Sequence, residues 1–135
     1  MKIFLDANIL FSASRDGSIL RVFLDFLVSK KHHLITNQHA AEEAGRNLLA
    51  KAFSTEKALA LLLKNVTFCN KLSADIISGL DEKDQPILRG ALGCQCDYLL
   101  TSDIKDFGKF MNRNNLGIKI GTPEHLANYL KLPKR

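Results

Sequence analysis

The chain has 135 residues, of which 46% are hydrophobic and 24% charged. This size and composition predict one domain over residues 1–135 and leave no room for a second. Its 19 basic and 14 acidic residues give a net charge of +5, which suits a polyanionic partner without identifying one. No apolar run reaches the roughly 18 residues of a membrane span, and the amino terminus does not resemble a secretory signal. We therefore expect a cytoplasmic protein that does not associate with membranes.

Short β-prone apolar runs alternate with longer segments of helical period along the chain. This alternation predicts an α/β fold, with a five-stranded, mainly parallel sheet flanked by helices. The expected strands cover residues 2–5, 33–36, 66–69, 98–101 and 118–120.

Amphipathic helices are expected between these strands. The first follows apolar residues spaced three or four apart, namely Ile19, Val22, Phe23, Phe26 and Leu27. The second is marked by Ala41, Ala44 and Leu48, and a third spans residues 55–64 with Ser54 as its N-cap. A fourth begins near Lys83 with Pro86 in its first turn. A last helix begins after Thr122, and residues 131–135 are expected to form a frayed basic tail.

The three cysteines do not fit a disulfide framework. Cys94 and Cys96 are separated by one residue, which is not the C-x-x-C spacing of zinc and redox sites. We therefore expect reduced, partly buried thiols.

Two aspartates follow expected strands closely. Asp6 comes directly after the first strand, and Asp103 comes shortly after the fourth. Ligands of open parallel sheets bind beyond the carboxyl ends of the strands. Two carboxylates placed there repel each other unless a cation compensates them, and oxygen ligands without histidine favour Mg²⁺ or Mn²⁺.

Two further acidic positions are ambiguous from the residues alone. Asp84 stands at the start of a helix, where capping the helix explains it as well as binding a metal does. Glu42 and Glu43 lie in the helix after the second strand, where a solvated glutamate is the usual case.

Four motifs in chain order resemble the PIN-domain family of nucleases. They are the strand ending in Asp6-Ala7-Asn8, the stretch Glu43-Ala44-Gly45-Arg46-Asn47-Leu48, the helix start Asp84-Gln85-Pro86, and the strand ending Thr101-Ser102-Asp103 followed by Asp106-Phe107. The resemblance spans nearly the whole chain. It departs from the family at Ser102, where glycine is frequent.

The resemblance implies a PIN-like fold and a metal-dependent endoribonuclease. It implies that Mg²⁺ or Mn²⁺ is held by Asp6, Glu43, Asp84 and Asp103, with Asp106 as an auxiliary ligand. Glu43 is preferred over Glu42 by the spacing. Thr101 would brace the pocket, and Asn8 would either orient a ligand or cap the next helix. The implied partners are an RNA substrate, a small antitoxin protein of a type II toxin-antitoxin pair, and a second copy of the chain in a homodimer.

Two other functions compete with this prediction. A PIN-like module can bind RNA or a partner without cutting. A receiver-type switch or an aspartate-nucleophile phosphatase also places aspartates at strand ends. However, Asp6-Ala7-Asn8 lacks the second aspartate of the phosphatase motif, and residues 66–70 offer no acceptor for a receiver.

Overall fold

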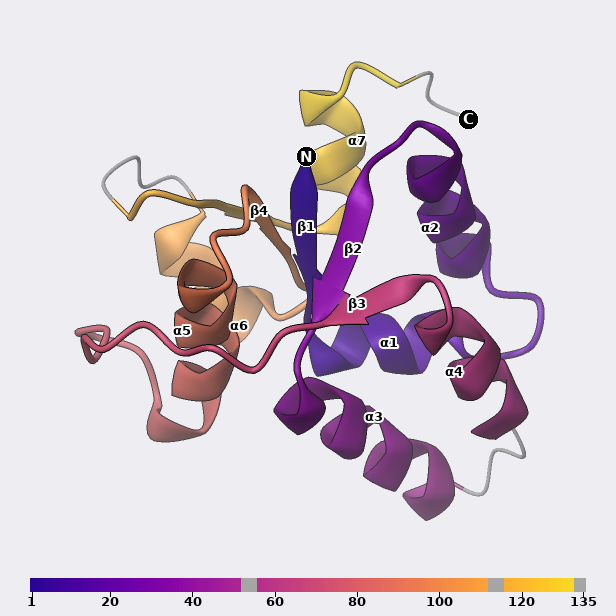
Figure 1. Ribbon diagram of the computed structural model, residues 1–135, viewed down its shortest axis with the longest axis horizontal. Coiled ribbons are helices and arrows are strands. Elements are labelled where there is room, and N and C mark those ends of the chain that lie inside the picture. Colours follow the sequence, from indigo (N-terminus) through magenta and orange to yellow (C-terminus); the bar gives the residue numbers. More distant parts are fainter. Residues whose placement is uncertain (52–55, 112–115, 133–135) are drawn as a thin grey trace.

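The computed structural model describes residues 1–51, 56–111 and 116–132, and its centre is a single sheet (Figure 1). Every neighbouring pair of strands is parallel, in the order β3-β2-β1-β4-β5. The strands are β1 (Lys2–Leu5), β2 (His33–Thr36), β3 (Val66–Phe68), β4 (Tyr98–Leu100) and β5 (Lys119–Gly121). The predicted α/β fold with five strands is confirmed, each strand lying within one residue of its expected bounds.

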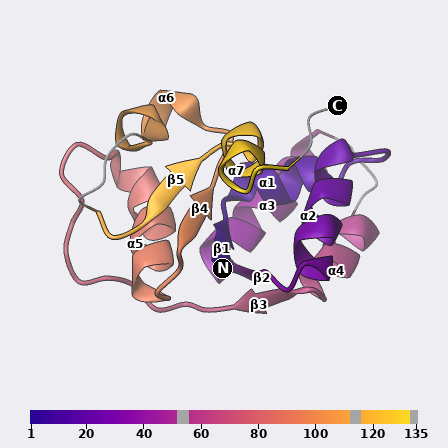
Figure 2. The ribbon, with the colours of Figure 1, turned by 90° about the horizontal axis from the view of Figure 1, so that it is seen from above.

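Helices connect the strands and cover the sheet. In the described part of the chain they are α1 (Ala7–Ala13), α2 (Ile19–Ser29), α3 (Gln38–Ala50), α4 (Glu56–Leu63), α5 (Gln85–Gly93), α6 (Ile104–Phe107) and α7 (Pro123–Tyr129). Two 3₁₀ turns, Glu82–Asp84 and Gly108–Phe110, precede α5 and follow α6. Helix α1 packs against α2, α3 and α4. Figure 2 shows α5 and α6 beside β4 and β5, on the other side of β1 from α2 and α4.

The apolar residues of the central strand require that both faces of the sheet be covered. Ile3, Phe4 and Leu5 of β1 are fully buried, although their side chains alternate between the faces. A continuous apolar strand is stable only where both faces are covered, as in parallel α/β sheets. Because β1 lies between β2 and β4, its carboxyl end lies in the middle of one sheet edge.

Two helices were not expected from the sequence. Helix α1 begins directly after β1, so its apolar residues continue the run of the strand and show no separate helical period. Helix α6 has only four residues, which is too short to show a period at all. The predicted N-cap Ser54 and the end of the predicted tail lie outside the described residues.

Helix α2 forms where it was expected, but its inward face is shifted. Leu24 and Leu27 are buried, whereas Ile19 and Val22 are mostly exposed. The predicted stripe therefore mixed inward and outward positions, because α2 is apolar on more than one side. None of the helices described is long and apolar enough to cross a membrane.

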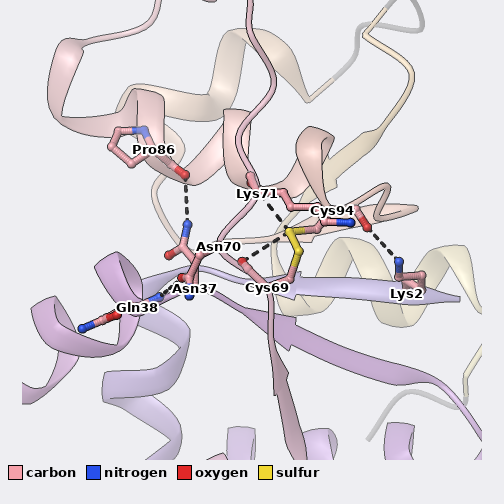
Figure 3. Close-up of a disulfide and its surroundings, with 8 residues drawn as sticks. All are labelled: Lys2, Asn37, Gln38, Cys69, Asn70, Lys71, Pro86 and Cys94. Carbon is pink, nitrogen blue, oxygen red and sulfur yellow. Dashed lines mark hydrogen bonds between the residues drawn. A yellow bond between two sulfur atoms is a disulfide. The ribbon is translucent and has the colours of Figure 1, made fainter.

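The expectation of reduced thiols was wrong for two of the three cysteines. Cys69, directly after β3, and Cys94, at the end of α5, form a disulfide (Figure 3). Cys96 is a free, buried thiol. The pairing was missed because the partners are 25 positions apart in the sequence; only the return of the chain along α5 brings their Cα atoms to 6.1 Å. Gly93 permits this approach, since a side chain there would collide with the backbone of Leu72 at 2.7 Å.

Candidate metal centre

Asp6 is held rigidly at the carboxyl end of β1. Its backbone N–H donates to the carbonyl of Leu100 at 3.1 Å, so the residue still belongs to the sheet edge. Its side chain is the N-cap of α1, with Oδ1 accepting from the backbone N–H of Ala7 at 2.6 Å. Oδ2 accepts from the hydroxyl of Thr101 at 2.7 Å. The carboxylate is therefore fixed by both the β1 end and the β4 end.

Thr101 and Asn8 connect Asp6 to Asp103. The hydroxyl oxygen of Thr101 accepts from the backbone N–H of Asp103 at 3.1 Å and from Nδ2 of Asn8 at 3.2 Å. Asn8 also donates to Oδ2 of Asp6 at 3.2 Å and accepts from the backbone N–H of Ser102 at 2.9 Å. The residue that caps α1 is Asp6, so the capping role considered for Asn8 is wrong. Asn8 instead joins α1 to the loop that carries Asp103.

The surroundings of Asp6 disfavour the ionised form of its carboxylate. Burial raises its pKa to about 6, against hydrogen bonds from Thr101 and Ala7 that lower it, and the charges of Glu43 and Asp103 raise it further. Glu43 on α3 is half-buried and acts on Asp6, whereas its neighbour Glu42 is exposed. Asp6, Glu43 and Asp103 thus form one electrostatically linked group.

A second acidic group stands at the start of α5. One carboxylate oxygen from each of Asp81, Asp84 and Asp106 lies within 4.8 Å of the others. Asp84 occupies the N-cap position of α5 but makes no capping hydrogen bond, and its Oδ2 is buried without a hydrogen-bond partner among the described residues. Capping therefore does not explain Asp84. Burial, and after it the charge of Asp106, raises the pKa of Asp84 to about 7.

Asp103 and Lys83 connect the two groups. The charge of Asp103 raises the pKa of both Asp6 and Asp84. Lys83 forms an ion pair with Asp106, with Nζ 3.3 Å from Oδ2. Burial acts to raise the pKa of Asp106, but hydrogen bonds with Asp103, with Lys83 and with the protonated form of Asp84 outweigh it and lower that pKa. The five predicted acidic residues therefore lie along one edge as two adjoining groups, and Asp81, not predicted, completes the second.

Asn37 positions the two helices that carry Glu43 and Asp84. Its Oδ1 accepts from the backbone N–H of Ala40 at 2.9 Å and caps α3, while its Nδ2 donates to the carbonyl of Pro86 at 3.1 Å in α5 (Figure 3). Gly90 leaves the space, since a side-chain carbon there would lie 2.6 Å from Nδ2 of Asn37. Asn37 was not singled out from the sequence: its position after β2 is a signal only for a helix N-cap, and its bond to α5 depends on the fold.

The donor set suits a hard divalent cation. All the side chains concerned offer carboxylate oxygens, which Mg²⁺ and Mn²⁺ prefer. An orphaned, buried oxygen on Asp84 and two pKa values raised by burial and like charge mark negative charge that the described residues leave uncompensated. A cation bound between the two groups would relieve both.

Comparison with known proteins gives matches in structure only. No sequence model of a known protein family and no curated protein matches the chain. Among solved structures, VapBC2 from Rickettsia felis bound to a DNA fragment from its promoter aligns at TM-score 0.63 and 17% identity, over 90% of this chain and 98% of that one. FitAB bound to an IR36 DNA fragment aligns at 0.58 and 17%, over 90% and 94%. VapBC-1 from nontypeable Haemophilus influenzae aligns at 0.55 and 16%, over 92% and 99%.

The toxin components of these VapBC and FitAB structures are PIN-domain proteins. The chain has a PIN-like fold. The resemblance seen in the sequence is thereby confirmed at the level of the fold. The PIN-like strand order β3-β2-β1-β4-β5 differs from the 2-1-3-4-5 order of receiver-type folds. The receiver alternative is therefore excluded by topology.

Proposed function

We propose that this chain is a Mg²⁺- or Mn²⁺-dependent endoribonuclease in which Asp6, Glu43, Asp84 and Asp103 hold the metal, with Asp106 as an auxiliary ligand. The observation that carries the proposal is the buried Oδ2 of Asp84, which has no partner in the described structure and lies among further carboxylates. Leaving such an atom unpaired is costly, so its position is best explained by a cation.

The residues of the chain have distinct tasks in this mechanism. A bound metal supplies an activated water and stabilises charge on the leaving oxygen of a phosphodiester. Thr101 and Asn8 fix the orientation of the Asp6 carboxylate through their hydrogen bonds at 2.7 and 3.2 Å. Oδ1 of Asp103 accepts from the backbone N–H of Asp106 at 2.9 Å, which orients the Asp103 carboxylate.

We also propose that the nuclease is the toxin of a type II toxin-antitoxin pair, in which a small antitoxin inhibits a homodimer. Support comes from the structural neighbours, which are toxin components of VapBC and FitAB systems. Production of the wild-type chain in a bacterial host is expected to arrest growth, and Asp6→Asn is expected to relieve the arrest. Equal arrest by both forms would contradict a toxin that acts through this site.

The nuclease is tested by incubating the purified protein with single-stranded and structured RNAs in Mg²⁺, Mn²⁺ or EDTA. We expect cleavage with metal, no cleavage in EDTA, and loss of cleavage in Asp6→Asn and Asp103→Asn. Glu42→Gln serves as the control, because it removes an exposed charge from the same helix as Glu43. If no RNA is cut with any metal, the chain is a non-catalytic PIN-like binding module.

A further inference from the structure

A cavity of about 220 Å³ lies at the opposite end of the sheet from the carboxylates. The described residues that line it are Tyr98, Met111, Lys119, Ile120, His125 and Tyr129. Tyr98 and Lys119 are the first residues of β4 and β5, whereas Asp6 and Asp103 follow the carboxyl ends of β1 and β4. Helix α7, which carries His125 and Tyr129, packs against β5, and Figure 1 shows it toward the end of the molecule at which β1 starts. The cavity is therefore separate from the candidate metal centre.

Tyr98 lines the cavity with its polar end accessible. The residue as a whole is 3% exposed, and its hydroxyl makes no hydrogen bond to a described residue. The hydroxyl is not among the buried polar atoms that lack a partner, so water or a ligand in the cavity can reach it. Gly121 provides its space, because a side-chain carbon at that position would overlap the Tyr98 hydroxyl. The absence of a side chain at Gly121 therefore leaves room for the Tyr98 ring, whose hydroxyl has no partner among the described residues.

The other polar groups around the cavity are also hydrogen-bond donors. Lys119 is exposed, and its Nζ lies 5.1 Å from the centre of the Tyr129 ring. Nδ1 of His125 accepts from the backbone N–H of Thr122 at 3.2 Å, which leaves Nε2 as the donor of the neutral ring. Burial raises the pKa of Tyr98 to about 12, so its hydroxyl keeps its proton. No acidic residue is among the described residues that line the cavity.

A set of donors with one positive charge and no carboxylate selects an anion. Phosphate offers several terminal oxygens, each able to accept from a different donor, and its charge pairs with an ammonium group. Ile120, Met111 and the ring of Tyr129 add apolar surface beside these donors. The volume is below the roughly 300–1,000 Å³ of pockets for drug-sized ligands, so the ligand is small.

We propose that this cavity binds a small phosphomonoester, with the phosphate held by Lys119 and Tyr98 and the organic group against Ile120 and Tyr129. The site is independent of the proposed nuclease and holds whether or not the chain cuts RNA.

The chain carries its own reporter for this site. It has two tyrosines and no tryptophan, and both tyrosines line the cavity. Tyrosine fluorescence is therefore measured during titration with inorganic phosphate and with butyl phosphate, in EDTA and at constant ionic strength set with sodium chloride. We expect a saturable change with both, and tighter binding of butyl phosphate because it also covers the apolar residues.

Variants separate this site from general charge effects. Lys119→Met is expected to weaken butyl phosphate binding by at least about tenfold, and Tyr98→Phe by about threefold or more, as expected for losing a charged and a neutral hydrogen bond. Lys57→Met on α4 is the matched control, because it removes an exposed lysine that does not line the cavity and should bind like wild type. Thermal unfolding confirms that each variant is folded. The proposal is overturned if neither probe gives a saturable change, if Lys119→Met binds like Lys57→Met, or if butyl phosphate binds no more tightly than inorganic phosphate.

Discussion

Glu42 and Glu43 are adjacent on α3 and chemically identical, yet their surroundings differ. Glu43 is half-buried and its charge raises the pKa of Asp6, whereas Glu42 is exposed. Glu43→Gln is therefore expected to weaken Mn²⁺ binding by about tenfold or more, the usual effect of losing a group at a metal site. Glu42→Gln is expected to bind as wild type does. Isothermal calorimetry measures both, and equal losses in the two variants would assign the helix surface, not Glu43, to the site.

The raised pKa values of Asp6 and Asp84, about 6 and about 7, predict a pH dependence of metal binding. A metal needs both carboxylates ionised, so protons compete with it below these values. Between pH 7.5 and pH 5.5 the apparent Mn²⁺ affinity is expected to fall by about a hundredfold, if both protons must leave. Calorimetry at several pH values checks this. An affinity that stays constant over this range would show that neither carboxylate is a ligand.

At the scale of elements, Asn37 ties the helix of Glu43 to the helix of Asp84. Asn37→Asp keeps the cap of α3, because a carboxylate still accepts from Ala40, but it cannot donate to the carbonyl of Pro86. We expect RNA cleavage to fall by about tenfold, since a buried hydrogen bond is lost and the two helices are no longer joined there. Asn70→Asp is the control: it adds the same charge at the start of α3 and keeps the bond that Asn70 accepts from Gln38. Equal activity of the two variants would contradict the positioning role.

The Cys69–Cys94 disulfide joins the end of β3 to the end of α5. Closing a loop of 25 residues is expected to stabilise the fold by roughly 3 kcal/mol. Reduction, or Cys69→Ser with Cys94→Ser, should lower the denaturation midpoint accordingly, while Cys96→Ala should keep its response to reductant. A thiol assay of the denatured, oxidised protein should find one free thiol of the three cysteines. Three free thiols without reductant would contradict the disulfide.

Some features of this molecule have local sequence signals, whereas others depend on contacts between distant segments. The strands could be predicted because their apolar runs are local, and Asp6 and Asp103 because they directly follow strands. Helix α1 was missed because its apolar residues merge with those of β1. Asp81, the bond from Asn37 to Pro86 and the disulfide were missed because each depends on chain segments that meet only in the fold. Local signals thus determined the elements, while contacts between elements completed the candidate site.

For the molecule as a whole, burial of the ionised Asp6 carboxylate lowers the free energy of unfolding, although the proposed metal site uses this carboxylate. Its folded pKa of about 6 exceeds its ordinary value of 3.8. Between these values the unfolded chain has already released the proton that folded Asp6 retains, so stability falls as pH rises through this window. Asp6 is 5% exposed, and the full penalty above about pH 6 is on the order of 3 kcal/mol.

This penalty predicts how the melting temperature depends on pH, both without metal and with Mn²⁺. In EDTA, the contribution of Asp6 lowers the melting temperature from pH 4 to pH 6.5, and Asp6→Asn is expected to lose that part of the slope. Saturating Mn²⁺ should raise the melting temperature of the wild type most at the upper end of the range, because binding to the folded state alone stabilises it. Thermal unfolding across this range tests both effects. A wild type whose pH slope equals that of Asp6→Asn, with no stabilisation by Mn²⁺, would mean that the Asp6 carboxylate is neither strained by burial nor relieved by a cation.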